Sequence, residues 1–429
     1  MTTDPAASET AWTGDDAFVA ELEACLRLRH APGLGPRTWK RIFERYDSAA
    51  AAVADARSFG PQGLCDDAVA AELWRGKAGD AARREIEAAA RKGLLPIPYF
   101  HPAYPAGLRE LPDPPVALYV VGDARLLAGP CVAMVGARQC SRYGFAAAHD
   151  IAAGLSAAGV TVVSGLAYGI DRQAHLGGLT GPGRSIAVCG TGLDLVYPDA
   201  NLDVWRALAA DGAIVSEFPP GTPPQAQNFP IRNRIIAGLS LGVMVVEAAA
   251  RSGSLITARL ALEQGREVFA LPGPVNLPTY AGCHALIAQG ARLVQTAGDI
   301  VAVLSRELAA YVDAPRAAPP PPPPAPPPRA RRRTPTVSPA ISPGAPTSAS
   351  PTAPKPTSSG TPVAAPQGLP PLEARVVELL ADGSKRHIDA LARALASASG
   401  DVSRALVVLE LKGLVRKWPG MYYTREVEG

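Results

Sequence analysis

The sequence predicts an α/β protein built around a doubly wound, mostly parallel β-sheet. The first observation is that short apolar runs alternate with helical stretches between residues 131 and 273. The second is that these runs are continuous Val, Ile and Ala segments, as in strands buried on both faces. The third is that four runs end at a glycine, where such sheets turn into helices and bind ligands. The six runs are CVAMVGA, VTVVSGLA, SIAVCGTG, AIVSEF, GVMVVEAA and EVFALPG.

Length and composition indicate a multidomain protein. A chain of 429 residues that is 47% hydrophobic can bury a sizeable core and is expected to hold two to four domains. No apolar run approaches the roughly 20 residues that span a bilayer, and the polar, acidic N-terminus is not a signal peptide. The six cysteines are scattered without metal or redox spacing. We therefore expect a cytoplasmic protein with buried thiols, no membrane contact, no metal site and no cofactor.

A helical domain is predicted over residues 16–95, with a break at Pro32-Gly33-Leu34-Gly35-Pro36. Helix, Gly/Pro hairpin and helix form the pattern of a helix-hairpin-helix (SAM-like) module, whose glycines bring backbone amides close to phosphates. An ordinary turn between two packed helices would produce the same pattern. If the module binds nucleic acid, the predicted secondary phosphate contacts are Gly33, Gly35, Arg37 and Lys40.

The Rossmann-like domain is predicted over residues 100–310. Its first strand-end turn begins at Gly136 and is not G-x-G-x-x-G, so a dinucleotide cofactor is poorly supported. The turn instead places Arg138, Ser141 and Arg142 at a helix start, which suits a phosphate. Ser141 taken alone is more simply a helix cap.

Two further turns carry polar or aromatic side chains. Asp171 and His175 share a helical face, so an acid–base pair is conceivable. Without a G-x-S-x-G nucleophile elbow anywhere in the sequence, a capping Asp and a packed His are the preferred interpretation. Tyr197 and Phe229 would either stack on a nucleobase or close the core.

The segment from Phe218 to Gly273 is the most informative for function. The turn Arg251-Ser252-Gly253-Ser254 lies where a strand meets the N-terminus of a helix. Exposed amides and the helix dipole make this junction an anion site. Arg232 and Arg234 lie one helix upstream, and we expect them to form a basic wall.

A proline-rich segment separates this body from a small C-terminal module. Residues 314–371 hold 21 of the 44 prolines and six Lys/Arg without an acidic residue, which predicts a disordered tether. The rest of the chain has 36 basic and 39 acidic residues, so overall basicity gives no argument for nucleic acid. Residues 372–429 read as three helices and a two-stranded hairpin, a winged helix. Its nearly balanced charge leaves duplex DNA and a protein partner both open.

The turns and strands together resemble the DNA-processing protein A (DprA, also called Smf) family across residues 102–304. FPIRNRIIAGLS and SGSLITA are the most specific motifs. The resemblance implies a single-stranded DNA-binding recombination mediator that is not an enzyme. It would form a homodimer, protect incoming DNA and help load the RecA recombinase in natural transformation (competence). The motifs, in order, are MVGARQCSRYG, VVSGLAYGIDRQAH, VCGTGLDLVYPDAN, SEFPPGTPPQAQNFPIRNRIIAGLS, VVEAAARSGSLITA, VFALPG and AGCHALIAQGA.

The resemblance also implies site residues. It places Arg138, Arg232, Asn233 and Arg234 in a DNA pocket, with Ser252, Gly253 and Ser254 as backbone donors. Two positions depart from the family pattern. Tyr168 stands where many relatives have Lys or Arg, and its ring could stack on a base. His284 stands where relatives usually have Asn.

The residues themselves favour single strands over duplex DNA. A concave strand-end pocket does not enter a groove, whereas amides, arginines and rings can follow a flexible backbone. Binding of this kind is largely sequence-independent and sensitive to salt. Two alternatives remain: a Rossmann-like nucleotide phosphoribohydrolase, which would need the P-G-G-x-G-T-x-x-E motif that this chain lacks, and a winged-helix transcriptional regulator.

Overall fold

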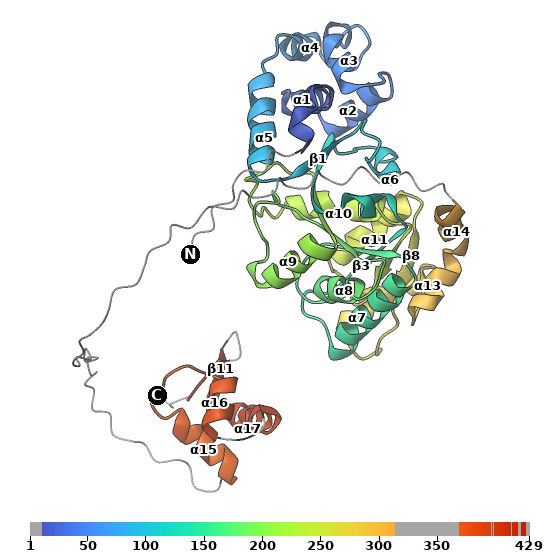
Figure 1. Ribbon diagram of the computed structural model, residues 1–429. Helices are drawn as coiled ribbons and strands as arrows, with labels where there is room; N and C mark the ends of the chain where they lie inside the picture. Colours follow the sequence, from blue (N-terminus) through green and yellow to red (C-terminus); the bar gives the residue numbers. More distant parts are fainter. Residues whose placement is uncertain are drawn as a thin grey trace, which may run out of the picture. The chain divides into compact units, whose positions relative to one another are not determined.

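A computed structural model of the chain describes residues 11–313 and 369–425, apart from residues 396, 398, 413 and 419–421. The described residues form two compact units (Figure 1), which divide within the proline-rich segment. The predicted tether, 314–371, lies almost wholly outside the described residues.

The first unit is built on a nine-stranded sheet in the order β1-β2-β6-β5-β4-β3-β7-β8-β9. The strands from β3 to β9 pair in parallel, and β1 and β2 extend one edge in antiparallel pairing. The prediction of a mostly parallel α/β sheet is confirmed. The bounds are β1 Leu95–Pro98, β2 Ala117–Gly122, β3 Cys131–Val135, β4 Thr161–Ser164, β5 Ser185–Val188, β6 Ala213–Ser216, β7 Gly242–Val245, β8 Glu267–Ala270 and β9 Arg292–Leu293.

The apolar runs predict β3 to β8. They do not predict the edge strands β1 and β9, nor β2, which lies beside β1. β1 reads Leu-Pro-Ile-Pro, and prolines argue against a central strand because they cannot donate to the ladder. At the edge of the sheet the missing proline N–H groups are tolerated, because β1 pairs with β2 on one side and needs no donors on the other.

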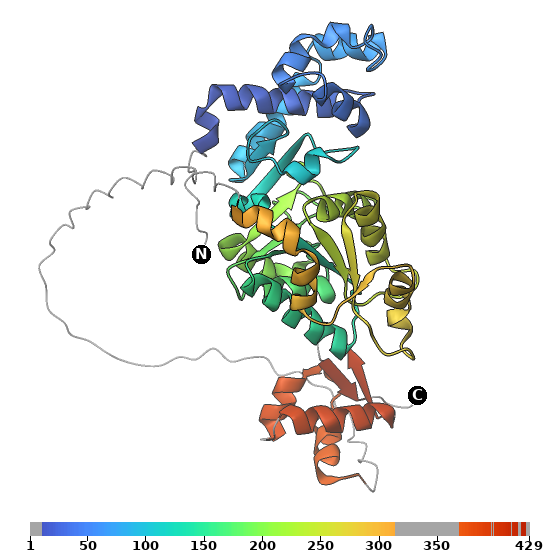
Figure 2. The ribbon, with the colours of Figure 1, turned by 90° about the vertical axis from the view of Figure 1, so that its right-hand side faces the viewer.

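Helices cover both faces of the sheet (Figures 1 and 2). Val132 and Met134 of β3 pack in one cluster with residues of α7 and α8, whereas Ala133 and Val135 pack in the other. This division follows from the alternation of side chains along a strand. The helices of this part of the unit are α6 Ala106–Arg109, α7 Arg142–Ala157, α8 Ile170–Gly178, α9 Leu202–Asp211, α10 Asn228–Gly238, α11 Ser254–Glu263, α12 Ala281–Ala288, α13 Ala297–Val303 and α14 Ser305–Asp313.

The strand order reverses at β3. The chain runs from β3 outward through β4, β5 and β6, and then returns to place β7 on the other side of β3. The loops that follow β3 and β7 therefore diverge, and a crevice opens between them at the carboxyl edge of the sheet.

The N-terminal helices pack against the β1 edge. α1 and α5 both contact β1, and Tyr119 of β2 donates a hydrogen bond to the carboxylate of Glu85 in α5. Residues of these helices and of the sheet belong to one hydrophobic cluster. The helices are α1 Asp16–His30, α2 Pro36–Phe43, α3 Ala49–Ala54, α4 Asp67–Trp74 and α5 Gly79–Arg91.

The second unit is a winged helix, as predicted. Its helices enclose a separate core that includes Val376, Leu391 and Leu406. Its sheet has the order β10-β12-β11, and the short strand β10 was not predicted. The elements are α15 Pro371–Leu379, β10 Arg386–His387, α16 Ile388–Leu395, α17 Ser399–Leu411, β11 Val415–Trp418 and β12 Tyr422–Arg425. Across all the described residues, we find no helix long and apolar enough to cross a bilayer.

Candidate functional site

A pocket of about 600 Å³ occupies the carboxyl edge of the sheet, at the reversal of strand order. Its wall is assembled from the loops that follow β3, β4, β5 and β7 and from α10 with the segment before it. The lining residues are Val135, Gly136, Arg138, Ala167, Asp171, Tyr197, Pro224, Ala226, Phe229, Pro230, Arg232, Asn233, Ile236, Ser252, Gly253, Ser254, Ile256 and Thr257.

Arg138 is the exposed cation of the pocket. It lies on the loop after β3, and its guanidinium carbon is 6.0 Å from the centroid of the Phe229 ring. Within the described part of the chain, no carboxylate lies at ion-pair distance from it, so its charge is available to a ligand. A guanidinium in this setting suits a phosphate oxygen.

The loop that carries Arg138 is held by Glu247, which follows β7 and is fully buried. The amide of Ala137 donates to the backbone oxygen of Glu247 at 2.8 Å. The amide of Ser141 donates to both carboxylate oxygens, at 3.1 and 2.9 Å. The Ser141 hydroxyl donates to Oε2 at 2.8 Å. Sequence reasoning missed Glu247, although an acidic residue at the end of a buried apolar strand signals a polar partner.

Ser141 therefore has a structural role. Its hydroxyl also accepts from the amide of Gly144 at 3.0 Å and caps α7, which is the simpler interpretation of this residue. Ser141, Arg142 and Tyr168 are not in the pocket wall. Arg142 is exposed at the first position of α7, and Tyr168 is exposed on the loop after β4; their DNA contacts stay predictions.

The loop after β4 is held in the same way by Asp171. One carboxylate oxygen, Oδ2, accepts from the amides of Gly165 at 3.1 Å and Ala167 at 3.3 Å. Nε2 of His175 accepts from the amide of Leu166 at 3.2 Å, and Nδ1 lies 2.8 Å from the Ser185 hydroxyl. Burial lowers the pKa of His175 to about 3 and raises that of Asp171. Asp171 and His175 thus accept hydrogen bonds from the backbone amides of the loop after β4 and hold that loop in place.

Arg232 lines the pocket, although its side chain is buried. Its Nη1 donates to the backbone oxygens of Gly165, at 2.8 Å, and Val188. The side chain is buried, with the guanidinium carbon 5.9 Å from the Phe229 ring centroid. Burial lowers its pKa. Arg232 thus ties two strand ends together and adds positive potential to the pocket, while Asn233 beside it also lines the wall.

The prediction that Arg234 belongs to the same wall is wrong. Arg234 is buried away from the pocket, where its Nη2 donates to Glu217 at 2.6 Å and its Nε lies 3.3 Å from Asp113. Residues two apart on an α-helix lie about 200° apart around its axis. One helix cannot direct Arg232 and Arg234 to the same pocket.

The turn after β7 faces the pocket as expected. Ser252, Gly253 and Ser254 line it, and α11 begins at Ser254. The N-cap residue Gly253 provides no side-chain cap. The amide of Ser252 donates to the backbone oxygen of Ala249 at 3.0 Å, and the amide of Ser254 donates to the Ser252 hydroxyl at 3.4 Å. The positive end of the helix dipole lies at this point of the wall. Two aromatic rings, Tyr197 and Phe229, line the same pocket, with centroids 5.6 Å apart.

In the hairpin between α1 and α2, two of the four residues predicted to contact phosphate, Gly33 and Lys40, have roles in the fold itself. Gly33 has a φ of +86°, and a Cβ at this position would lie 2.9 Å from Val69. Lys40 donates to the backbone oxygen of Arg109 at 2.6 Å and joins α2 to α6. Gly35 caps α2 through its backbone, and Arg37 is exposed. Phosphate contacts by these residues stay predictions, and the engaged Lys40 is the least available.

Metal ligands and reactive thiols do not define this site. The described residues include no group of three or more His, Cys, Asp or Glu arranged to hold a metal ion. Burial raises the pKa of the thiols of Cys131 and Cys189 to about 12 and about 11. Both thiols are therefore protonated and unreactive at neutral pH.

The chain matches family models over most of its folded parts. The model described as DNA recombination-mediator protein A matches residues 96–305, and the one described as DprA winged helix domain matches residues 360–421. Protein Smf of Synechocystis is 38% identical over 329 residues, which cover 76% of this chain and 78% of the relative. DNA processing protein DprA of Streptococcus pneumoniae is 47% identical over 199 residues, which cover 46% of this chain and 70% of the relative.

A solved structure is similar to this chain in both fold and sequence. The X-ray structure of DprA from Streptococcus pneumoniae has a TM-score of 0.55 and 35% sequence identity. The match covers 64% of this chain and 95% of that chain. The chain therefore belongs to the DprA/Smf family of DNA-processing proteins.

Proposed function

We propose that this protein binds single-stranded DNA in the pocket at the carboxyl edge of its sheet. One observation carries the proposal: an exposed arginine with no carboxylate at ion-pair distance among the described residues, the N-terminus of a helix and two aromatic rings line the same cavity. Phosphates would bind Arg138 and the helix N-terminus at Gly253, and a base would contact Tyr197 or Phe229. A pocket closed in by loops suits a flexible strand better than a duplex groove.

The wider role follows from family membership. We propose that the protein acts in the cytoplasm as a recombination mediator during natural transformation. As a homodimer, it would protect incoming single strands and help load RecA, without catalysing a reaction itself. The loading step is tested by following RecA's ATP hydrolysis on DNA coated with single-strand-binding protein. Addition of this protein should shorten the lag, and an unchanged lag would refute the loading role.

The binding site is tested with Arg138→Ala and fluorescent oligo-dT at moderate salt. Loss of one charge-assisted phosphate contact should weaken binding by about tenfold. The slope of log K against log salt should fall by about 0.7, the value for one phosphate on a single strand.

The matched control is Arg125→Ala. Arg125 is another exposed arginine, in the short helix before β3, where it is paired with Asp123 at 2.8 Å and does not line the pocket. This variant should bind oligo-dT like the unmodified protein. Equal losses for both variants would mean that binding reflects net charge rather than the pocket.

A further inference from the structure

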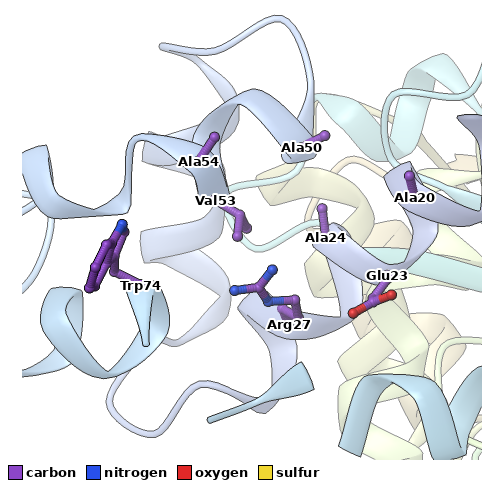
Figure 3. A pocket seen from close by; sticks show the side chains of 8 residues that line it. All are labelled: Ala20, Glu23, Ala24, Arg27, Ala50, Val53, Ala54 and Trp74. Carbon is purple, nitrogen blue, oxygen red and sulfur yellow. The ribbon is translucent and has the colours of Figure 1, made fainter. Parts of the chain in front are cut away.

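A second cavity lies within the N-terminal helices, between α1, α3 and α4 (Figure 3). It has a volume of about 390 Å³, and no residue predicted to bind DNA lines it. Small apolar side chains, including Ala24 and Val53, form one side. Arg27 projects from α1 into the middle, with Trp74 of α4 on the far side (Figure 3).

Arg27 is the cation of this pocket. Nη2 of Arg27 donates to the backbone oxygen of Leu73 at 3.2 Å, which holds the guanidinium in place. Among the described residues no carboxylate comes within ion-pair distance of Arg27. The one acidic lining residue, Glu23, is paired with Arg83 at 3.0 Å. Arg83 is also paired with Asp80 at 2.5 Å. The Arg27 guanidinium is thus held by a neutral carbonyl oxygen, with one carboxylate in the same lining.

The ring of Trp74 is an exposed aromatic surface, and a contact with Arg57 fixes its orientation before any ligand binds. Its side chain is 46% exposed, which is unusual for so large an apolar group. The guanidinium of Arg57 lies 3.4 Å from the ring centroid and covers one face. A cation stacked on the indole stabilises one ring orientation. Less conformational entropy is then lost when a planar group stacks on the ring.

We propose that this pocket is a second contact for single-stranded DNA. A base would stack on Trp74 while the neighbouring phosphates approach Arg27 and Arg57. The inference rests on the proposed function, because the ligand is the same strand continued beyond the sheet-edge pocket. An exposed ring beside two arginines is a combination that binds single strands without reading sequence. An acidic peptide is the competing occupant, and binding measurements separate the two.

The test compares oligo-dT of about 8 and about 50 nucleotides, because only a long strand can occupy both pockets. Trp74→Ala should weaken binding of the long oligonucleotide by about fivefold to tenfold, as expected for one lost stacking contact. Binding of the short oligonucleotide should stay within twofold. Arg27→Gln should reduce the salt slope for the long oligonucleotide by about 0.7.

Trp74→Phe is the matched control, since it keeps a ring for stacking and should restore most of the affinity for the long oligonucleotide. Thermal unfolding would verify that each variant is folded. Unchanged affinity of folded Trp74→Ala for the long oligonucleotide would overturn the inference and favour a protein partner. Equal losses at both lengths would also overturn it. Failure of the unmodified protein to bind either length would instead refute the proposed function.

Discussion

Arg232 and Arg234 show how two similar side chains on one helix serve different purposes. Arg232 faces the strand ends and the pocket, whereas Arg234 is buried between Glu217 and Asp113. Burial raises the pKa of Glu217, and Arg234 opposes this effect. Arg234 thus stabilises the unit and does not contact the pocket.

Arg234→Ala should therefore destabilise the protein without weakening the DNA site. Removing one partner of a buried ion pair leaves the other charge uncompensated, which costs about 3–5 kcal/mol of unfolding free energy. Urea denaturation should show this loss, while the folded variant binds oligo-dT normally at low temperature. The opposite pattern, normal stability with weaker binding, would place Arg234 at the DNA.

His175 should make the stability of the fold depend on pH. Its pKa is about 3 in the folded state because burial disfavours the charged form, and it is about 6.5 when unfolded. The unfolded state therefore binds one more proton between these values, so stability falls as the pH falls from about 6.5 towards 3. The contribution is up to about 1.4 kcal/mol per pH unit. Unfolding titrations of the protein and of His175→Gln should diverge over this range by that slope, and parallel curves would contradict the assignment.

The loops after β3 and β4 are each held by a buried carboxylate, of which Asp171 lines the pocket and Glu247 does not. Glu247 holds the loop of Arg138, and Asp171 holds the loop from Gly165 to Ala167. Each carboxylate accepts backbone amides that would otherwise be unsatisfied near the sheet edge. Both loops are in this way shaped before a ligand binds.

Glu247→Gln should weaken DNA binding through Arg138. The amide side chain keeps one acceptor oxygen and loses the second and the charge, so the amide and hydroxyl of Ser141 are no longer both well bonded. We expect a loss of about fivefold in oligo-dT affinity with a modest loss of stability. In the double variant with Arg138→Ala, the Glu247 substitution should add little further loss. Fully additive losses would show that Glu247 does not act through the Arg138 loop.

At the scale of the whole molecule, the two compact units divide the sequence motifs between them. The DNA-recombination-mediator match and both pockets belong to the first unit, and the winged helix has a core of its own. The first unit joins the N-terminal helices to the sheet through one hydrophobic cluster. A strand that contacts both pockets would therefore be bound by one compact body.

The buried strands β3 to β8, the glycine turns at their ends, the winged helix and the family could all be predicted from the amino-acid sequence. These features depend on local periodicity and on motifs that contiguous residues carry. The two-residue spacing on α10 also predicts that the side chains of Arg232 and Arg234 point in different directions, because residues two apart lie about 200° apart around a helix. Which side chains can reach a ligand depends on contacts between distant parts of the chain. Among the described residues no carboxylate lies at ion-pair distance from Arg138, whereas Lys40 and Ser141 are bonded to Arg109 and Glu247. Those partners lie 69 and 106 residues away in the chain, so no local pattern could reveal them.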